Sequence, residues 1–93
     1  MHPPTLVYRP DTLDSVRSTM LAAFADGAHR VVLDLDTLTR LDTEGVRGLI
    51  TLLRRSREVG GELALKVTRP ELLRSLQVMA LDRLFPMVRD IAA

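Results

Sequence analysis

The sequence contains no cysteine and no tryptophan, and its aromatic residues are limited to Tyr8, Phe24 and Phe85. Without cysteine there is no disulfide framework, no thiolate chemistry and no cysteine-ligated zinc. The chain also lacks an excess of charge of one sign. It has 13 lysine and arginine residues and 12 aspartate and glutamate residues, which gives a formal net charge of +1. Nucleic-acid binding relies on a strong positive field or on several aromatic stacking platforms. We therefore expect no nucleic-acid partner.

The chain has no uninterrupted apolar run of the roughly 20 residues that a membrane-spanning helix needs. Its first residues also lack the basic segment and apolar stretch of an export signal, so we expect no membrane insertion and a cytoplasmic location. The two histidines, His2 and His29, have no matching set of ligands, and no metal or cofactor is expected. Glycine-rich phosphate loops, GxSxG and HExxH are absent too. These absences favour a binding protein over an enzyme.

Strand-like and helix-like apolar patterns alternate along the chain. With 93 residues, of which 46% are hydrophobic, it suits a single domain over residues 1–93, with frayed ends at 1–4 and 90–93. The predicted elements are a strand at 5–8, a helix from 11 or 12 to 26–27, a strand at 30–36, a helix at 43–59, a strand at 62–67, a short helix opened by a capping box at 68–71, and a turn with a strand-like run at 81–88. This order is typical of βαβ units. The predicted fold is α/β, with a mixed, mainly parallel four-stranded sheet and helices packed on it.

The stretch 41–46, Leu-Asp-Thr-Glu-Gly-Val, lies where a strand-like run gives way to the longest predicted helix. The Asp42 carboxylate is suited to accept hydrogen bonds from the free amides of a first helical turn, so it predicts the helix N-terminus. The positive end of the helix dipole then lies beneath Thr43 and Glu44. Such a position favours negative charge, whether a carboxylate, a bound anion or a phosphoryl group.

The helix predicted from Thr43 to Val59 has two faces. Its apolar stripe consists of Val46, Leu49, Ile50 and Leu53. The opposite face carries Glu44, Arg47, Gly48, Thr51 and Arg55. A glycine inside a helix costs about 1 kcal/mol relative to alanine but lets another backbone come close. The face is thus either a contact surface or an ordinary solvated face with an indifferent glycine, and spacing alone leaves both open.

Asp34 and Asp36 are two residues apart in a predicted strand and therefore share a face. Paired carboxylates can hold a metal or perform acid–base chemistry. A structural role is favoured, because no further carboxylate or histidine is placed by spacing to complete an oxygen-ligand shell. A carboxylate-based enzyme that uses Asp34, Asp36 and Asp42 is the hypothesis from another functional class.

The sequence resembles the STAS domain family, the sulfate transporter and anti-sigma factor antagonist fold, and in particular its free-standing bacterial anti-anti-sigma factors. Residues 31–35 look like the central strand of the family, 41–46 like its signature D-S-S/T-G-L/V, 54–61 like its helix ending, and 81–85 like its common G-L-D-R-L-F segment. Family members usually begin with a longer hairpin, where this chain has only the run at 5–8.

The resemblance implies a regulatory role without catalysis. In the family, the unmodified domain binds a partner kinase of the anti-sigma type, and this complex frees a sigma factor. The kinase phosphorylates a hydroxyl residue after the motif aspartate, and the phosphate breaks the complex. By this resemblance Asp42 is the motif aspartate and Thr43 is the first hydroxyl position. Glu44 stands at the second position, which is the acceptor in the best-known members, and a carboxylate there cannot be phosphorylated.

Three interpretations stay open. Thr43 is the acceptor of a working switch; Glu44 is a constitutive partial mimic of phosphate; or the domain is the small cytoplasmic subunit bound to the ATPase of a lipid-trafficking ABC transporter. A domain of a larger stress-signalling assembly is a further possibility, and we expect a monomer or weak dimer. The predicted contact surface consists of Asp42, Thr43, Glu44, Arg47, Gly48 and Thr51.

Overall fold

A computed structural model describes residues 3–88 of the chain. Its elements in order are β1 (Thr5–Val7), the 3₁₀ turn η1 (Pro10–Thr12), α1 (Leu13–Ala25), β2 (Arg30–Asp34), α2 (Thr43–Glu58), β3 (Glu62–Lys66), α3 (Pro70–Val78), the 3₁₀ turn η2 (Leu81–Arg83) and β4 (Met87–Val88). Each predicted strand and helix is present, with ends that differ by a few residues.

Four strands form one sheet in the order β1-β2-β3-β4. Leu33 of β2 lies in register with Leu6 of β1 and Leu65 of β3, and Leu65 in turn pairs with Met87 of β4. The predicted four-stranded α/β fold is confirmed. Within residues 3–88 all three strand pairs are parallel rather than mixed, because each connection returns the chain to the same end of the sheet.

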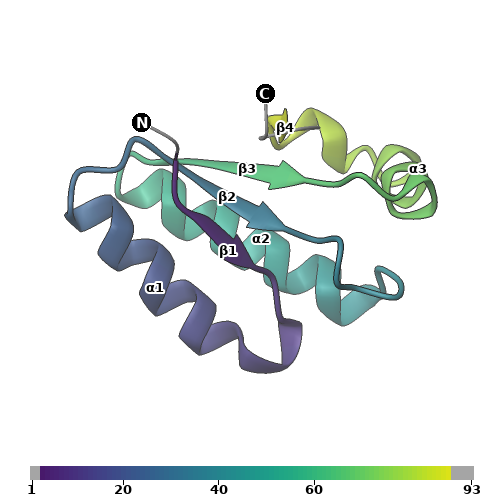
Figure 1. Ribbon diagram of the computed structural model, residues 1–93, viewed down its shortest axis with the longest axis horizontal. Helices are drawn as coiled ribbons and strands as arrows, with labels where there is room; N and C mark the ends of the chain where they lie inside the picture. The colour runs from purple at the N-terminus through teal and green to yellow at the C-terminus, as the bar shows by residue number, and fades with distance from the viewer. Residues whose placement is uncertain (1–2, 89–93) are drawn as a thin grey trace.

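Helices α1 and α2 lie side by side on one side of the sheet, and α3 lies beyond the end of β3 (Figure 1). Val31 and Leu33 of β2 are completely buried, and so is Val32, whose side chain points to the other face. An inner strand of a parallel sheet is covered on both faces, and this explains the continuous apolar run in the sequence. The helices contribute Val16, Met20, Leu49, Leu52, Leu53, Leu72 and Leu76 to the same core.

The predicted frayed ends fall only partly within the structure. Residues 1–2 and 89–93 lie outside the described residues. The carbonyl oxygen of Pro4 accepts a hydrogen bond of 2.8 Å from the amide of Val32. The expectation that residue 4 is frayed is therefore wrong, because a β2 amide ties it to the sheet edge.

The predicted capping box at 68–71 is also wrong. Helix α3 begins at Pro70 with Arg69 at its N-cap, and no side chain caps it. Thr68 instead donates its amide at 2.8 Å and its hydroxyl at 2.7 Å to the carboxylate of Asp36. Asp36 thus takes the place of Glu71 as acceptor for the Thr68 amide, while the Glu71 carboxylate accepts hydrogen bonds from the Arg69 guanidinium.

Candidate functional site

Helix α2 starts where the sequence predicts. Asp42 has an extended backbone, its Oδ1 atom accepts a hydrogen bond of 2.8 Å from the amide of Gly45, and its carbonyl accepts one of 3.0 Å from the amide of Val46. The side chain thus satisfies an amide that the helix leaves without a partner. The prediction of Asp42 as the N-cap is confirmed, and the cap fixes the direction in which the next two side chains leave the helix.

The side chains that follow the cap form an exposed polar strip. Thr43, Glu44 and Arg47 are exposed, and Thr51 is half-buried. The Thr51 hydroxyl donates to the carbonyl of Arg47 at 3.0 Å, so it is partly satisfied within the helix. Thr43 also lines a shallow hollow together with Arg47. The strip therefore presents a hydroxyl, a carboxylate and a guanidinium within the first turns of α2.

Gly48 does not belong to this strip. It is buried, and a Cβ atom added to it would overlap the hydroxyl oxygen of Tyr8 and lie 3.3 Å from Leu13 Cδ1. The prediction that Gly48 contributes to an exposed contact surface is wrong. The close approach that the glycine permits is internal to the domain: it makes room for a tyrosine side chain that comes from the end of β1.

Tyr8 is the residue of this region that the sequence patterns miss. Its side chain is completely buried, and its hydroxyl donates a hydrogen bond of 2.6 Å to the carbonyl of Gly45. Burial, together with the nearby charge of Asp42, raises the pKa of the Tyr8 hydroxyl to about 12. The neutral hydroxyl therefore joins the start of α2 to the strand edge. The signal in the sequence that could have indicated this contact is the pair of glycines Gly45 and Gly48, which lie three positions apart in α2.

The apolar stripe of α2 is wider than predicted. Leu49 and Leu53 are buried as expected, whereas Val46 and Ile50 are only half-buried. Leu52, which the predicted stripe omits, is completely buried. The helix packs against both α1 and β3, so two neighbouring elements cover it from different sides.

Asp34 and Asp36 come together with Lys66 in an internal polar network. Lys66 Nζ lies 3.5 Å from Asp34 Oδ2 and 3.6 Å from Asp36 Oδ2. The amide of Asp36 also donates to Asp34 Oδ1 at 2.9 Å. Partial burial acts to raise the pKa of Asp36, but the hydrogen bonds from Thr68, together with the charge of Lys66, outweigh it and hold that pKa below its ordinary value.

Arg69 connects this network to the loop before α2. Its guanidinium donates to the carbonyls of Leu38 and Asp36, while Glu71 accepts from the same group. The loop that carries Asp42 is therefore held from the start of α3. Within residues 3–88, no three histidine, aspartate or glutamate side chains form a group that could hold a metal ion. Asp34 and Asp36 are paired with Lys66 and Asp42 is committed to its helix cap, so the three aspartates do not converge as the enzyme hypothesis requires.

Asp36→Asn is expected to lower the free energy of unfolding at pH 7 by about 1–2 kcal/mol, because Thr68 and Lys66 lose a charged acceptor. The pKa of Asp36 is lower in the folded protein than in the unfolded chain, so its contribution is present above about pH 4 and is lost as the pH falls further. Urea unfolding between pH 7 and pH 3 should show the curves of the wild type and the Asp36→Asn variant converging in acid. A constant difference across that range would contradict the assignment.

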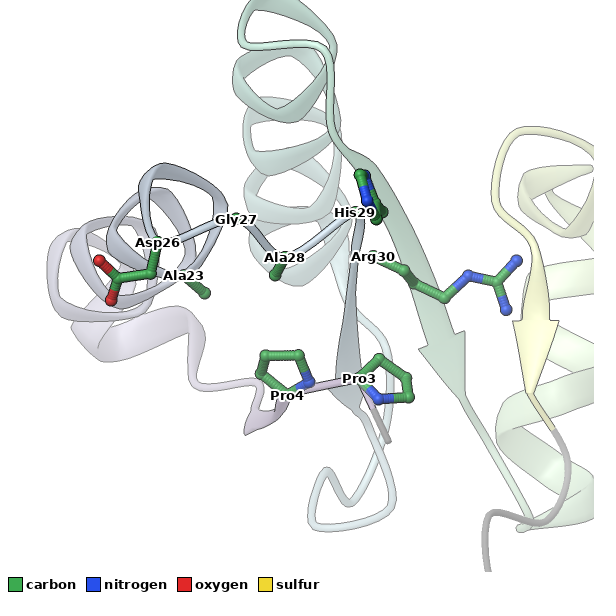
Figure 2. A pocket seen from close by; sticks show the side chains of 8 residues that line it. All are labelled: Pro3, Pro4, Ala23, Asp26, Gly27, Ala28, His29 and Arg30. Carbon is green, nitrogen blue, oxygen red and sulfur yellow. The ribbon is translucent and has the colours of Figure 1, made fainter. Parts of the chain in front are cut away.

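Another hollow, with a volume of about 710 Å³, lies elsewhere, near the start of β2. Figure 2 shows that Pro3, Pro4 and Ala23 line it, whereas the carboxylate of Asp26 and the guanidinium of Arg30 point away from it. A ligand site normally combines an apolar wall with a few polar groups that converge on the ligand. This hollow lacks that convergence, so we assign no ligand to it.

None of the helices in the described part of the chain is long and apolar enough to cross a bilayer.

No protein of curated function matches the chain significantly in sequence. Among the solved structures that share its fold are two of one protein. The solution structure of the protein TM1081 aligns with a TM-score of 0.73 at 17% identity, over 95% of this chain and 74% of that one. A crystal structure of a proposed anti-sigma factor antagonist from Thermotoga maritima, also TM1081, aligns with a TM-score of 0.68 at 18% identity, over 99% and 78% of the two chains.

The family model named STAS domain matches residues 11–93. The match includes the loop and cap that precede α2, the whole of α2, and the β3 and α3 elements that hold that loop in place. The match begins after β1. The chain belongs to the STAS domain family.

Proposed function

We propose that this chain is a non-enzymatic, protein-binding regulatory domain of the anti-sigma factor antagonist type, which acts in the cytoplasm. The observation that carries the proposal is the capped start of α2, which presents Thr43, Glu44 and Arg47 on a rigid helix. Membership of the STAS family and the fold shared with a proposed anti-sigma factor antagonist support it. The partner surface comprises Asp42, Thr43, Glu44, Arg47 and Thr51.

Thr43 is the proposed point of regulation. Its hydroxyl is exposed at the first position of α2, where a kinase can reach it and where the helix dipole favours an added phosphate. Phosphorylation adds about 1.5 to 2 negative charges at pH 7. A partner that docks on an uncharged threonine then meets a doubly charged group. The proposed partner is an anti-sigma factor that is also a protein kinase.

Glu44 supports a second form of the same function, in which the domain is not switched. The Glu44 side chain is exposed directly beside Thr43, so a carboxyl group stands there whether or not Thr43 is modified. A carboxylate has about half the charge of a phosphate and fewer acceptor oxygens, so it mimics phosphate only in part. If the Glu44 carboxylate suffices to weaken the partner complex, Glu44→Ser should raise the affinity of the domain for its partner.

The test begins with the intact mass of the protein purified from its native cells, before and after phosphatase treatment. We expect a loss of about 80 Da, the mass of one phosphoryl group, that maps to Thr43. Affinity capture with wild-type protein and with a Thr43→Ala, Glu44→Arg double variant then identifies the partner. Thr19→Ala is the matched control, because Thr19 is exposed on α1, away from the strip.

Three results of the capture are informative. A captured kinase of the anti-sigma type that the double variant loses supports the proposal. A captured transporter ATPase assigns the domain to the transporter class instead. A partner that binds the double variant as well as the wild type shows that the surface is wrongly placed.

A further inference from the structure

A continuous groove runs from the start of α2 to the side of α3. It consists of two adjoining hollows of about 500 and 540 Å³, and both are lined by Leu41 and Met79. Val46 adds to the apolar wall on the α2 side, and Val78 adds to it on the α3 side. We call this feature the α2–α3 groove. It extends the strip of α2 onto a second helix that no sequence pattern connected with the site.

The apolar side chains of the groove are more exposed than a solitary domain requires. Val78 is 80% exposed and Met79 is 40% exposed, although both close an amphipathic helix whose Leu72 and Leu76 are buried. Single exposed apolar residues are common, but neighbouring ones in a concave site mark a surface that another molecule covers. Val78 and Met79, together with the half-buried Leu41, form such a group.

The charges along the groove are predominantly positive. Arg40, Arg47 and Arg74 line it and, within residues 3–88, take part in none of the ion pairs. The two carboxylates that also line it are already engaged, Asp42 with the amide of Gly45 and Glu71 with Arg69. The groove therefore offers an apolar floor with three guanidinium groups around it.

We infer that the α2–α3 groove binds an amphipathic helix of the partner, with an apolar stripe on the floor and aspartate or glutamate residues facing the arginines. A helix fits better than an extended peptide, since the lining residues belong to α2, α3 and the loop residues next to them, and none belongs to a strand whose edge could pair with a main chain. The three arginines select acidic flanks, because like charges across an interface are strongly unfavourable. This inference rests on the proposed function, because the groove adjoins the polar strip of α2 that is proposed to bind the partner.

The position of Thr43 gives the groove a direct link to regulation. Thr43 lines the same hollow as Arg40 and Arg47. A phosphate there pairs with these guanidinium groups, since arginine matches phosphate geometry well. The acidic flank of the bound helix then loses its partners and meets a like charge. Phosphorylation and helix binding compete for the same two arginines.

The experiment uses two synthetic helical peptides of about 14 residues, or about four turns. Both carry leucine at positions i, i+3, i+4 and i+7; the flanks of one are glutamate and those of the other are lysine. Each is titrated into the ¹⁵N-labelled protein and followed by NMR. We expect the acidic peptide to shift the amides of Leu41, Val46 and Met79 and to bind about tenfold more tightly than the basic one.

Variants of the groove make the test specific. Arg74→Glu should remove the preference for the acidic peptide, and Val78→Asp should abolish binding; because Val78 is 80% exposed, this change leaves the core intact. Arg54→Glu is the matched control, as Arg54 is exposed on α2 outside the groove. No shifts in the groove at millimolar acidic peptide, or equal binding of both peptides, would overturn the inference.

Two further outcomes are distinguishable. If sedimentation equilibrium shows a dimer that Val78→Asp converts to a monomer, the occupant is a second copy of this chain and the inference fails. If the captured partner is lost with Arg47→Glu but retained with Arg74→Glu and Val78→Asp, the groove inference fails while the proposed function of the α2 strip stands.

Discussion

Replacing Tyr8 with alanine is expected to lower the free energy of unfolding by about 3–5 kcal/mol, the range found for truncating large buried aromatic side chains. Tyr8 is completely buried, fills the space above Gly48 and bonds the carbonyl of Gly45. Its loss leaves a cavity between β1 and the start of α2. Native domains have a total stability of only about 5–15 kcal/mol, so the variant will be at the edge of folding.

Urea unfolding monitored by circular dichroism measures this effect. Tyr8→Phe is the matched control, because it keeps the ring and removes only the 2.6 Å hydrogen bond to Gly45, a loss of about 1 kcal/mol. If Tyr8→Ala costs no more than Tyr8→Phe, the ring does not support the start of α2 and the packing argument is wrong.

The same contact can be tested from the other side. Gly48→Ala places a methyl group on the Tyr8 hydroxyl oxygen, and overpacking of this kind costs about 1–3 kcal/mol. In the Tyr8→Phe, Gly48→Ala double variant that oxygen is absent, and alanine also improves helix propensity. The double variant should therefore be more stable than Gly48→Ala alone. If the effects of the two substitutions on the free energy of unfolding simply add, the two residues do not touch.

Phosphorylation of Thr43 is expected to weaken binding of the identified partner by about 10- to 100-fold, which lies within the usual range of coupling between sites. The added charge falls beside the carboxylate of Glu44 and within the hollow lined by Arg47. A docking surface built for a neutral hydroxyl must then accommodate a strongly hydrated dianion. The affected quantity is the equilibrium affinity, which isothermal titration calorimetry of unmodified and singly phosphorylated protein measures directly.

Two controls separate the phosphate from other changes. Thr43→Val keeps the shape of the side chain, should bind the partner nearly as well as wild type, and should no longer respond to the kinase. Glu44→Ser tests whether the standing negative charge already weakens the complex. Equal affinity of the phosphorylated and unmodified proteins would show that Thr43 is not the switch.

The start of α2 was predictable because its signals are local. An N-cap acts within three residues of sequence, so Asp42 alone indicated where the helix begins and which side chains follow it. The order of strands and helices was predictable for the same reason, since apolar periodicity reports which face of each element is buried. The family signature fell on the same residues, and the STAS family model matches them.

Gly48 shows where local reasoning fails. Its position in the helix repeat placed it among polar neighbours, and a glycine has no side chain whose polarity could indicate burial. The burial of Gly48 depends on Tyr8, which lies 37 residues from the Gly45 carbonyl that it bonds. The capping box at Thr68 failed similarly, because Asp36 competes for that residue from 32 positions away.

The sequence by itself determined the α/β class, the four-stranded sheet, the capped start of α2 and the exposure of Thr43 and Glu44, because each follows from residues a few positions apart. Only the tertiary structure decided that Tyr8 supports that start, that Arg69 holds the loop before it, and that Arg74 shares one groove with Thr43. These contacts join distant elements through side chains on different faces. Their physical basis is the packing of one helix or strand against another, which no periodicity within a single element can encode.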